Sequence, residues 1–420
     1  MTSEVVTTAI KPSRRALFRN RDYMILWGGQ MVSIAGSTTS GIARPLLVLA
    51  LTGSAAQAGF IAAFGTLPYL IFSLPAGALV DRWNRKRVMI ICNFGRAVHA
   101  ASIVVAGLSG HLTILQLYVT AFIGGTLFVF FNLSEVAALP RVVTREQLPL
   151  ATAQNQTGGI SAGLVGSPLG GILFQIGQTM PFLADALSYA GSVASLLLIR
   201  VDFQPDRRPN VRSLFGDIVE GIVWLWHHPL IRFMALLTGG YNFTSSGLSL
   251  MMIILAKEEG AAPGFIGLVL AISSVGGIAG SLLGPAVQRR FTFGQAITIL
   301  AWISAVSYLA LGLARVPLLV GIIGAVITLA GPIYNVVQFS YRMAIIPDEL
   351  QGRVNSVVRL LAFGLTPLGL SLAGLAIQML GVVHTILLFG TVLVALALLA
   401  SLNPHVRHAP RVTGVDQSPR

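Results

Sequence analysis

The sequence predicts an all-α polytopic membrane protein with twelve membrane-spanning helices, arranged as two pseudo-repeats of six. Composition is the first reason: 54% of the 420 residues are hydrophobic and only 10% are charged, whereas soluble chains carry about 25% charged residues. Segment length is the second reason, because apolar runs of about twenty residues, enough to cross a bilayer as a helix, recur along the chain. A chain with so few charges cannot cover a water-facing surface.

The expected spans fall into two groups of six around a polar connection. In order they are Met24–Leu51, Ala55–Val80, Val88–Leu108, Leu112–Pro140, Gln147–Ile176, Met180–Ile199, Pro229–Ala256, Phe265–Val287, Phe293–Ala314, Pro317–Ile346, Leu350–Leu380 and Val382–Leu402. This order gives a cytosolic tail (residues 1–22), an N-terminal half (23–200), a cytoplasmic linker (201–228), a C-terminal half (229–402) and a second cytosolic tail (403–420). The second part of the linker has the pattern of an amphipathic interfacial helix.

Lysine and arginine are distributed unevenly over the expected loops. Most of the 28 basic residues fall in the two tails and the even-numbered loops, while the odd-numbered loops hold only Lys257 and Arg315. Cytoplasmic loops of membrane proteins collect basic residues. We therefore expect a protein of a bacterial-type cell membrane with both termini on the cytoplasmic side. The same rule accounts for the net charge of +13 without a nucleic-acid partner.

The loop after the second span concentrates charge in the stretch GALVDRWNRKRV, from Gly77 to Val88. A degenerate copy, GPAVQRRFTFGQ, follows the eighth span, and two parallel six-span repeats are an established transporter plan. Because a carboxylate in this loop can accept hydrogen bonds from its arginines, and its glycine lets helices approach, we predict a cytoplasmic gate. A plain basic loop is the alternative. The predicted gate comprises Gly77, Asp81, Arg82, Arg85, Lys86, Arg289 and Arg359.

The same loop resembles the signature of the major facilitator superfamily, roughly G-x-L-x-D-R-x-G-R-[KR]. Asn84 stands where that family usually has glycine, and asparagine also tolerates left-handed backbone angles. Three further stretches resemble the branch that includes macrolide and siderophore (enterobactin) exporters: FRNRDYMILWGGQMVSIAG, PFLADALSYAGSVASLLL and IPDELQGRVNSVVRLLAFGLTPLG. The resemblance implies the major facilitator fold, a functional monomer, and rocking of one half against the other.

The fifth span contains GLVGSPLGG, which resembles the antiporter signature G-x-x-x-G-P-x-x-G-G with Ser167 as a departure. The glycines and the proline favour a thin, bent helix that packs tightly. Ordinary packing through small residues is the alternative. The predicted antiporter-type helix is defined by Gly163, Gly166, Pro168, Gly170 and Gly171.

Charged side chains within spans are costly, so each is a candidate functional residue. Glu135 and Asp185 are the acidic residues well inside spans, and proton coupling needs a carboxylate. Glu135 is the first choice, with pairing to Arg141 or Arg96 as the alternative. Asp185 is expected near the outer end, where a structural role is the alternative. The predicted coupling group also includes Arg96 and Arg44, and Arg44 is expected to bind an anionic substrate or to pair with a carboxylate.

Two spans interrupt their apolar runs with aromatic and amide side chains, which suit the wall of a cavity for an amphipathic or aromatic substrate. Hydrogen bonding between helices is the alternative. The predicted cavity residues are Tyr241, Asn242 and Phe243 in the seventh span, and Tyr334, Asn335 and Gln338 in the tenth.

The sequence has no G-x-x-x-x-G-K-[ST], H-E-x-x-H or G-x-S-x-G motif and no Cys/His cluster. We therefore expect no enzyme activity, no cofactor, no metal site and no direct use of ATP. The sequence predicts a secondary active transporter, a proton-coupled exporter (antiporter) of an amphipathic small molecule such as an antibiotic or natural product. Its partners would be this substrate, protons and membrane lipid. The alternatives are a proton-coupled importer or facilitator of the same fold and a non-transporting membrane sensor.

Overall fold

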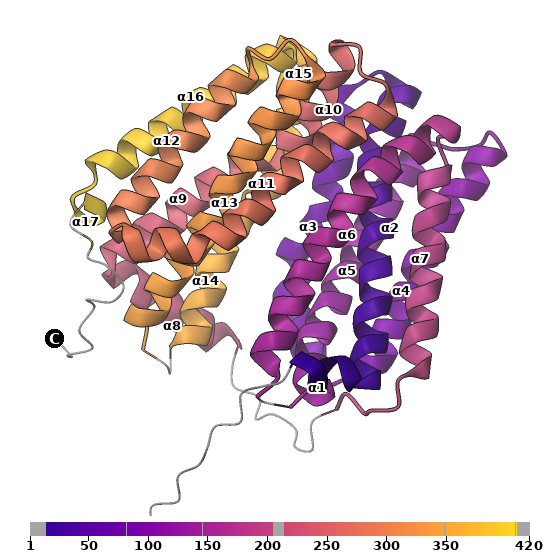
Figure 1. Cartoon of the computed structure of the whole chain (residues 1–420), viewed down its shortest axis with the longest axis horizontal. Coiled ribbons are helices and arrows are strands. Elements are labelled where there is room, and N and C mark those ends of the chain that lie inside the picture. Colours follow the sequence, from indigo (N-terminus) through magenta and orange to yellow (C-terminus); the bar gives the residue numbers. More distant parts are fainter. Residues whose placement is uncertain are drawn as a thin grey trace, which may run out of the picture.

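The computed structural model describes residues 14–80, 82–144, 146–204, 214–347, 350–407 and 409. Within these residues all regular structure is helical (Figure 1). The helices are α1 (Arg14–Arg19), α2 (Arg21–Thr52), α3 (Ala55–Val80), α4 (Arg85–Leu108), α5 (Ile114–Val142), α6 (Leu148–Ile176), α7 (Met180–Leu198), α8 (Leu214–His227), α9 (Pro229–Ser246), α10 (Leu248–Glu258), α11 (Pro263–Arg290), α12 (Phe293–Leu311), α13 (Pro317–Ile345), α14 (Gln351–Gly364), α15 (Thr366–Leu380), α16 (Val382–Leu402) and α17 (Pro404–Arg407). The predicted all-α class is confirmed.

Eleven segments among the described residues are long and apolar enough to cross a membrane. Helices α2 to α7 follow the first six expected spans, α11, α12, α13 and α16 follow four of the others, and α14 with α15 forms the eleventh. The remaining expected span is divided at Gly247 into α9 and α10. Counting this interrupted pair as one crossing gives the twelve crossings of the predicted fold class.

Polar side chains begin several helices at the change from loop to apolar run. Asn84 is the N-cap of α4: its φ is −68°, and its side-chain oxygen accepts a hydrogen bond from the Arg87 backbone N–H at 3.0 Å. A cap of this kind satisfies a backbone donor that has no partner within the helix. The left-handed angles that asparagine tolerates are therefore not used here. Asn20 caps α2 in the same way.

The two six-helix halves contact each other at one end of the molecule. There α3 packs against α15, and α6 packs against α11. Glycines permit the close approach: a Cβ added to Gly59 would lie 2.6 Å from the Leu370 carbonyl oxygen, and one added to Gly267 would lie 2.6 Å from the Ser167 carbonyl oxygen. This is the end where α2 ends and α3 begins, the outer face in the expected topology.

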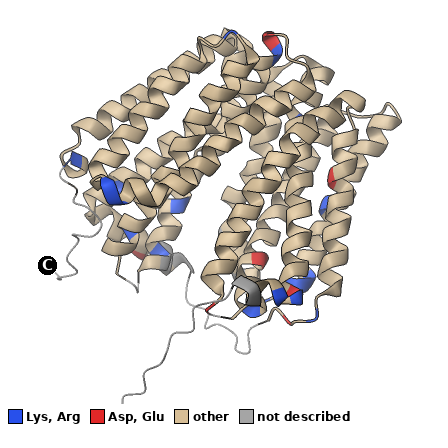
Figure 2. Ribbon diagram, in the orientation of Figure 1, with Lys and Arg blue, Asp and Glu red and all other residues tan. Residues whose placement is uncertain are grey.

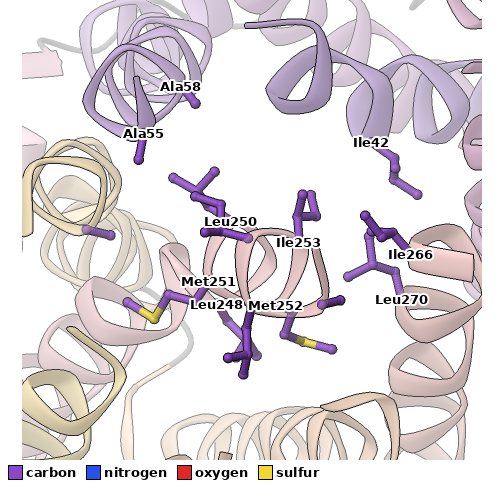
Figure 3. Packing of buried hydrophobic residues seen from close by; sticks show 14 of the residues in the cluster. Ile42, Ala55, Ala58, Leu248, Leu250, Met251, Met252, Ile253, Ile266 and Leu270 are labelled. Atoms are coloured by element: carbon purple, nitrogen blue, oxygen red, sulfur yellow. The ribbon is translucent and has the colours of Figure 1, made fainter. Parts of the chain in front are cut away.

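Buried apolar side chains form one core that joins the halves at this outer end. Figure 3 shows Leu250 and Ile253 of α10 on the side that faces Ala55, Ala58 and Ile42 of the N-terminal half. Two further cores lie toward the opposite end, and each contains residues of one half alone. The outer end is therefore sealed by a shared core, whereas the opposite ends of the halves are packed separately.

Most lysine and arginine residues gather at the separately packed end. Figure 2 shows them near α1 and α8, with few charged residues along the middle of the helices. This is the distribution that a cytoplasmic face would have. The cytoplasmic placement of both termini stays a prediction.

Helix α8 docks on the C-terminal half. Gly221 packs so closely that an added Cβ would lie 2.7 Å from the Arg353 carbonyl oxygen of α14, and the Arg353 side chain forms an ion pair with Glu220. Leu225 is buried in the core, whereas Trp226 is exposed. One face of α8 therefore contacts the protein and the other faces outward, the arrangement expected of a helix at a membrane surface.

Candidate functional site

A cavity of about 500 Å³ separates α3 and α5 of the N-terminal half from α14 and α15 of the C-terminal half. Aromatic walls come from Tyr69, Phe128 and Phe363, and polar side chains include Asn132 and Arg359. Pockets of this size that mix aromatic surface with a few polar groups are typical of small-molecule sites.

A second cavity, of about 400 Å³, lies between α2 and α3 on one side and α10, α11 and α13 on the other. Its walls are mainly aliphatic, and Leu250 and Ile253 of the outer core also line it. Hydroxyl groups from both halves add polarity, and Arg44 contributes a charge. This cavity therefore lies directly against the outer seal.

A third cavity, of about 180 Å³, lies within the N-terminal half and is lined by Arg44 of α2, Arg96 of α4 and Asp185 of α7. Ser40 donates a hydrogen bond to Asp185 Oδ2 at 2.5 Å. Asp185 is only 2% exposed, and its carboxylate is attracted by both guanidinium groups. Asp185 Oδ1 and Arg44 Nε have no hydrogen-bond partner among the described residues. Asp185 therefore belongs to a buried charged cluster, one and a half turns inside α7.

Aromatic rings and hydroxyl groups hold Arg96 in this cluster. Its guanidinium carbon lies 4.2 Å from the centroid of the Tyr189 ring and 5.6 Å from that of Phe128. Its N–H groups donate to Asn93 Oδ1 and Ser37 Oγ, both at 3.4 Å. Ser37 and Tyr189 share a hydrogen bond of 2.8 Å between their hydroxyls. Stacking on rings and planar hydrogen bonding both suit a guanidinium better than an ammonium group.

Glu135 lies on α5 and is not among the residues that line the 180 Å³ cavity. Gln30 of α2 donates a hydrogen bond to Glu135 Oε2 at 3.0 Å. The carboxylate is also attracted by the charge of Arg96. Both candidate carboxylates thus interact with the same guanidinium while each has its own hydrogen-bond donor on α2.

Asp81 of the predicted gate lies outside the described residues. At Gly77 no atom of the described residues lies within 4 Å of an added Cβ, so the close approach expected there is not made in this conformation. Arg82 is exposed. Arg85 donates to the carbonyl oxygens of residues 137 and 203, at 2.9 and 3.3 Å, and Lys86 donates to that of residue 199 at 2.6 Å. These three contacts join residues of the N-terminal half to one another or to the segment after α7, and none of them reaches the C-terminal half.

The two predicted gate residues of the C-terminal half make their contacts elsewhere. Arg289 Nε donates to the Pro285 carbonyl oxygen of its own helix at 3.2 Å. Arg359 of α14 lines the 500 Å³ cavity instead of joining the loop residues. In this conformation the described residues of the predicted gate are not brought together, and the gate stays a prediction.

The glycines of α6 make close contacts on two sides. Cβ atoms added to Gly166 and Gly170 would each lie 2.6 Å from a carbonyl oxygen of α2, and Gly171 is pressed against the start of α11. Pro168 lies inside the helix. Gly163 faces open space, with no described atom within 4 Å of an added Cβ. Close packing is therefore limited to the outer part of the expected motif.

The predicted cavity residues line neither of the two cavities between the halves. Tyr241 and Tyr334 stack with ring centroids 6.0 Å apart inside the C-terminal half. Thr238 shares a hydrogen bond of 2.8 Å with Tyr334 and accepts one of 2.7 Å from Gln338. Asn242 donates to a carbonyl oxygen of α14 at 2.8 Å. These side chains join helices in this conformation, which was the alternative interpretation.

The other two predicted cavity residues also line neither cavity between the halves. Phe243 stacks on Phe389 with ring centroids 5.8 Å apart, and Asn335 is exposed on α13. The aromatic–amide pattern does not by itself distinguish the two interpretations, because buried polar groups between helices need hydrogen-bond partners as much as a cavity wall needs polar groups.

Sequence reasoning missed several side chains of the charged cluster and of the larger cavity. For the cluster, the sequence did contain a signal: residues four apart on a helix lie on the same face. Ser40 lies four residues before Arg44, and Tyr189 lies four residues after Asp185. No comparable signal marked Tyr69 as part of a cavity wall, because its position depends on how the halves meet.

Comparisons with known proteins agree with this architecture. A family model described as transmembrane secretion effector matches residues 12–419. The chain is 29% identical over 398 residues to the multidrug efflux pump Tap of Mycolicibacterium fortuitum, which covers 89% of this chain and 93% of the relative. It is 24% identical over 394 residues to macrolide efflux protein A of Streptococcus pyogenes, covering 92% and 96%. The predicted resemblance to exporters is confirmed.

Solved structures support the same fold. The nucleoside transporter NupG superposes with a TM-score of 0.75 at 12% sequence identity, covering 91% of this chain and 98% of that chain. At this identity the likeness concerns the fold alone. Given the match over nearly its whole length, the chain belongs to the transmembrane secretion effector family of major facilitator transporters.

Proposed function

We propose that this transporter is a proton-coupled exporter (antiporter) that moves an amphipathic small molecule out of the cell by alternating access. The observation that carries the proposal is the 500 Å³ cavity between the halves, with aromatic and polar walls on the side where the halves are packed separately. Such walls suit a molecule with both apolar and polar parts. Relatives that are named efflux proteins support export over import or facilitation.

Alternating access needs the two halves, residues 23–200 and 229–402, to rock against each other. With both termini in the cytoplasm, the conformation described here corresponds to a state open to the cytoplasm. Closing that side would bring the loop of Gly77 and Arg82 toward the loop of Arg289. The contacts of Arg85 and Lys86 within the N-terminal half support movement of the first loop together with that half.

Asp185 is the better proposed proton carrier, because it lines a cavity that adjoins both substrate cavities, whereas Glu135 lines none of the three. The 180 Å³ cavity shares Arg44 with the 400 Å³ cavity and shares Phe128 with the 500 Å³ cavity. Protonation of Asp185 would remove the negative charge that attracts the guanidinium groups of Arg44 and Arg96. Such a local change in charge can bias the packing of α2, α4 and α7 between two states.

The proposal is tested with everted membrane vesicles from an efflux-deficient host, in which export appears as uptake. Macrolides, tetracyclines and dyes are supplied with and without a proton uncoupler. We expect uptake that the uncoupler abolishes. Asp185→Asn is expected to lose gradient-driven accumulation and to keep downhill exchange, because a neutral amide cannot carry the proton.

Two companion variants sharpen this test. Glu135→Gln tests whether the second buried carboxylate carries the proton. Glu258→Gln, at an exposed site at the outer end, is the control that should accumulate substrate normally. If Asp185→Asn and Glu135→Gln both still concentrate substrate in response to the proton gradient, the assignment of the proton carrier is wrong. If no probe moves in either direction, a non-transporting sensor becomes the better description.

A further inference from the structure

The 500 Å³ cavity carries positive charge and no negative charge among its described lining residues. Its charged residue is Arg359 of α14. The 400 Å³ cavity follows the same rule, with Arg44 as its charged described residue. Asp185 lines only the smaller cavity inside the N-terminal half, where Ser40 donates to it and two arginines attract it. A molecule in either cavity between the halves would therefore meet a guanidinium group and no carboxylate of the described lining.

Arg359 has no hydrogen bond or ion pair with any other described residue, although it lies on a helix whose Arg353 is paired with Glu220. Its side chain is exposed to the open cavity. Tyr69 and Asn132 also line the cavity, and their side-chain polar groups likewise lack a partner among the described residues. Three donor-bearing side chains from both halves are thus available to one guest molecule.

Aromatic rings surround these donors. Tyr69 and Phe363 meet edge to face with centroids 6.3 Å apart, across the boundary between the halves. Phe128 adds a third ring to the wall. Flat apolar groups pack well against such rings, whereas a small inorganic anion would leave them without a contact.

Resting on the proposed export function, we infer that Arg359 is a substrate-binding residue and that the transported class is amphipathic organic anions. These are molecules with an aromatic or similarly flat apolar body and a carboxylate, phenolate or sulfonate group. The guanidinium of Arg359 binds the anionic group, with Tyr69 and Asn132 as further donors, and the three rings hold the apolar body. A lipophilic cation would leave water for a cavity whose nearest lining charge repels it.

The test compares two dyes that share a xanthene ring system, the anion fluorescein and the cation rhodamine 6G. Binding to the purified full-length protein in detergent is measured by fluorescence anisotropy. We expect fluorescein to bind more tightly than rhodamine 6G. Arg359→Gln is expected to weaken fluorescein binding by about tenfold or more, the usual effect of losing a charged hydrogen bond, and to leave rhodamine 6G unchanged or tighter.

Two further variants separate charge from folding. Arg359→Lys keeps the charge and should retain more fluorescein binding than Arg359→Gln. Arg315→Gln removes a positive charge at the outer end, beside Glu259 and away from the cavity, and should bind both dyes as the wild type does. Tighter binding of rhodamine 6G by the wild type, absence of fluorescein binding, or equal weakening of both dyes by Arg359→Gln would overturn the inference.

The same dyes in everted vesicles distinguish this inference from the proposed function. If fluorescein binds with the expected dependence on Arg359 but is never accumulated, export is wrong and the anion subsite stands. If cationic probes are exported at rates that do not depend on Arg359, export stands and the anion subsite is wrong.

Discussion

Neighbouring basic side chains just before and at the start of α4 have different surroundings. Arg85 is buried and donates to carbonyl oxygens at the end of α5 and in the segment after α7, at 2.9 and 3.3 Å. Arg82 is exposed. One short basic run therefore contains a buried residue that ties helices of the N-terminal half together and an exposed residue that could meet the other half in the proposed closure of the cytoplasmic side.

Substitution separates these two roles. Arg85→Gln is expected to lower both transport and the thermal unfolding midpoint of the purified protein, because a hydrogen bond from a charged group to a buried carbonyl is worth about 1.5–3 kcal/mol. Arg82→Gln is expected to lower transport alone. The measurement is thermal unfolding in detergent beside vesicle transport. Equal midpoints for the two variants would show that the contacts of Arg85 add nothing to stability.

At the scale of helices, the outer contact between α3 and α15 depends on two facing glycines. An added Cβ on Gly59 would lie 2.8 Å from the Gly374 Cα, so the helix backbones nearly touch. Gly28 on α2, by contrast, faces open space. The same residue type thus serves helix contact at one site and has no such role at the other.

Gly59→Val is expected to push the outer ends apart and favour the state open to the outside. Overpacking costs about 1–3 kcal/mol, which shifts a two-state equilibrium by about 5- to 150-fold. The reporter is Leu250→Cys in a Cys92→Ser background, labelled from outside by a maleimide that does not cross membranes. Labelling should be faster with Gly59→Val and unchanged with Gly28→Val. Equal labelling rates in the reporter protein, with Gly59→Val and with Gly28→Val would show that the contact at Gly59 does not keep the outer side closed.

The interruption of the seventh span shows where sequence patterns stop being informative about helices. The expected span Pro229–Ala256 runs through Gly247 without a break, but an added Cβ at this residue would lie 2.5 Å from the Ala373 Cβ of α15. The break between α9 and α10 therefore coincides with a contact to a helix more than a hundred residues away. Local composition does not reveal which helix Gly247 contacts.

For the whole molecule, composition was sufficient to predict the fold class because the bilayer sets the length and polarity of each crossing. The site was less predictable. Asp185 and Arg44 were found because charge in a span is rare, whereas Tyr69 and Phe363 are ordinary aromatic residues until two halves bring them together. The same limit applies to Tyr241 and Tyr334, which lie inside one half. Sequence does not specify which helix faces meet, so it could not place them there.

Rocking of the halves predicts a change in distance between the two equivalent loops. Spin labels are attached through Arg82→Cys and Arg289→Cys in the Cys92→Ser background, and the distance between the labels is measured by pulsed electron paramagnetic resonance. We expect a long distance in the wild-type background and a shift of the population to shorter distances when Gly59→Val is added. A distribution that Gly59→Val does not alter would contradict coupled motion of the two ends.

The shared core around α10 gives the transport cycle an energetic direction. Opening the outer face would bring leucine, isoleucine and methionine side chains of this core into water, at about 25 cal/mol for each Å² of apolar surface exposed. Among the described residues, opening the inner face exposes no core common to both halves. Without a gradient, the empty carrier is therefore expected to rest with its cytoplasmic side open, and in the proposed proton-coupled cycle the gradient would supply the free energy that breaks the outer seal.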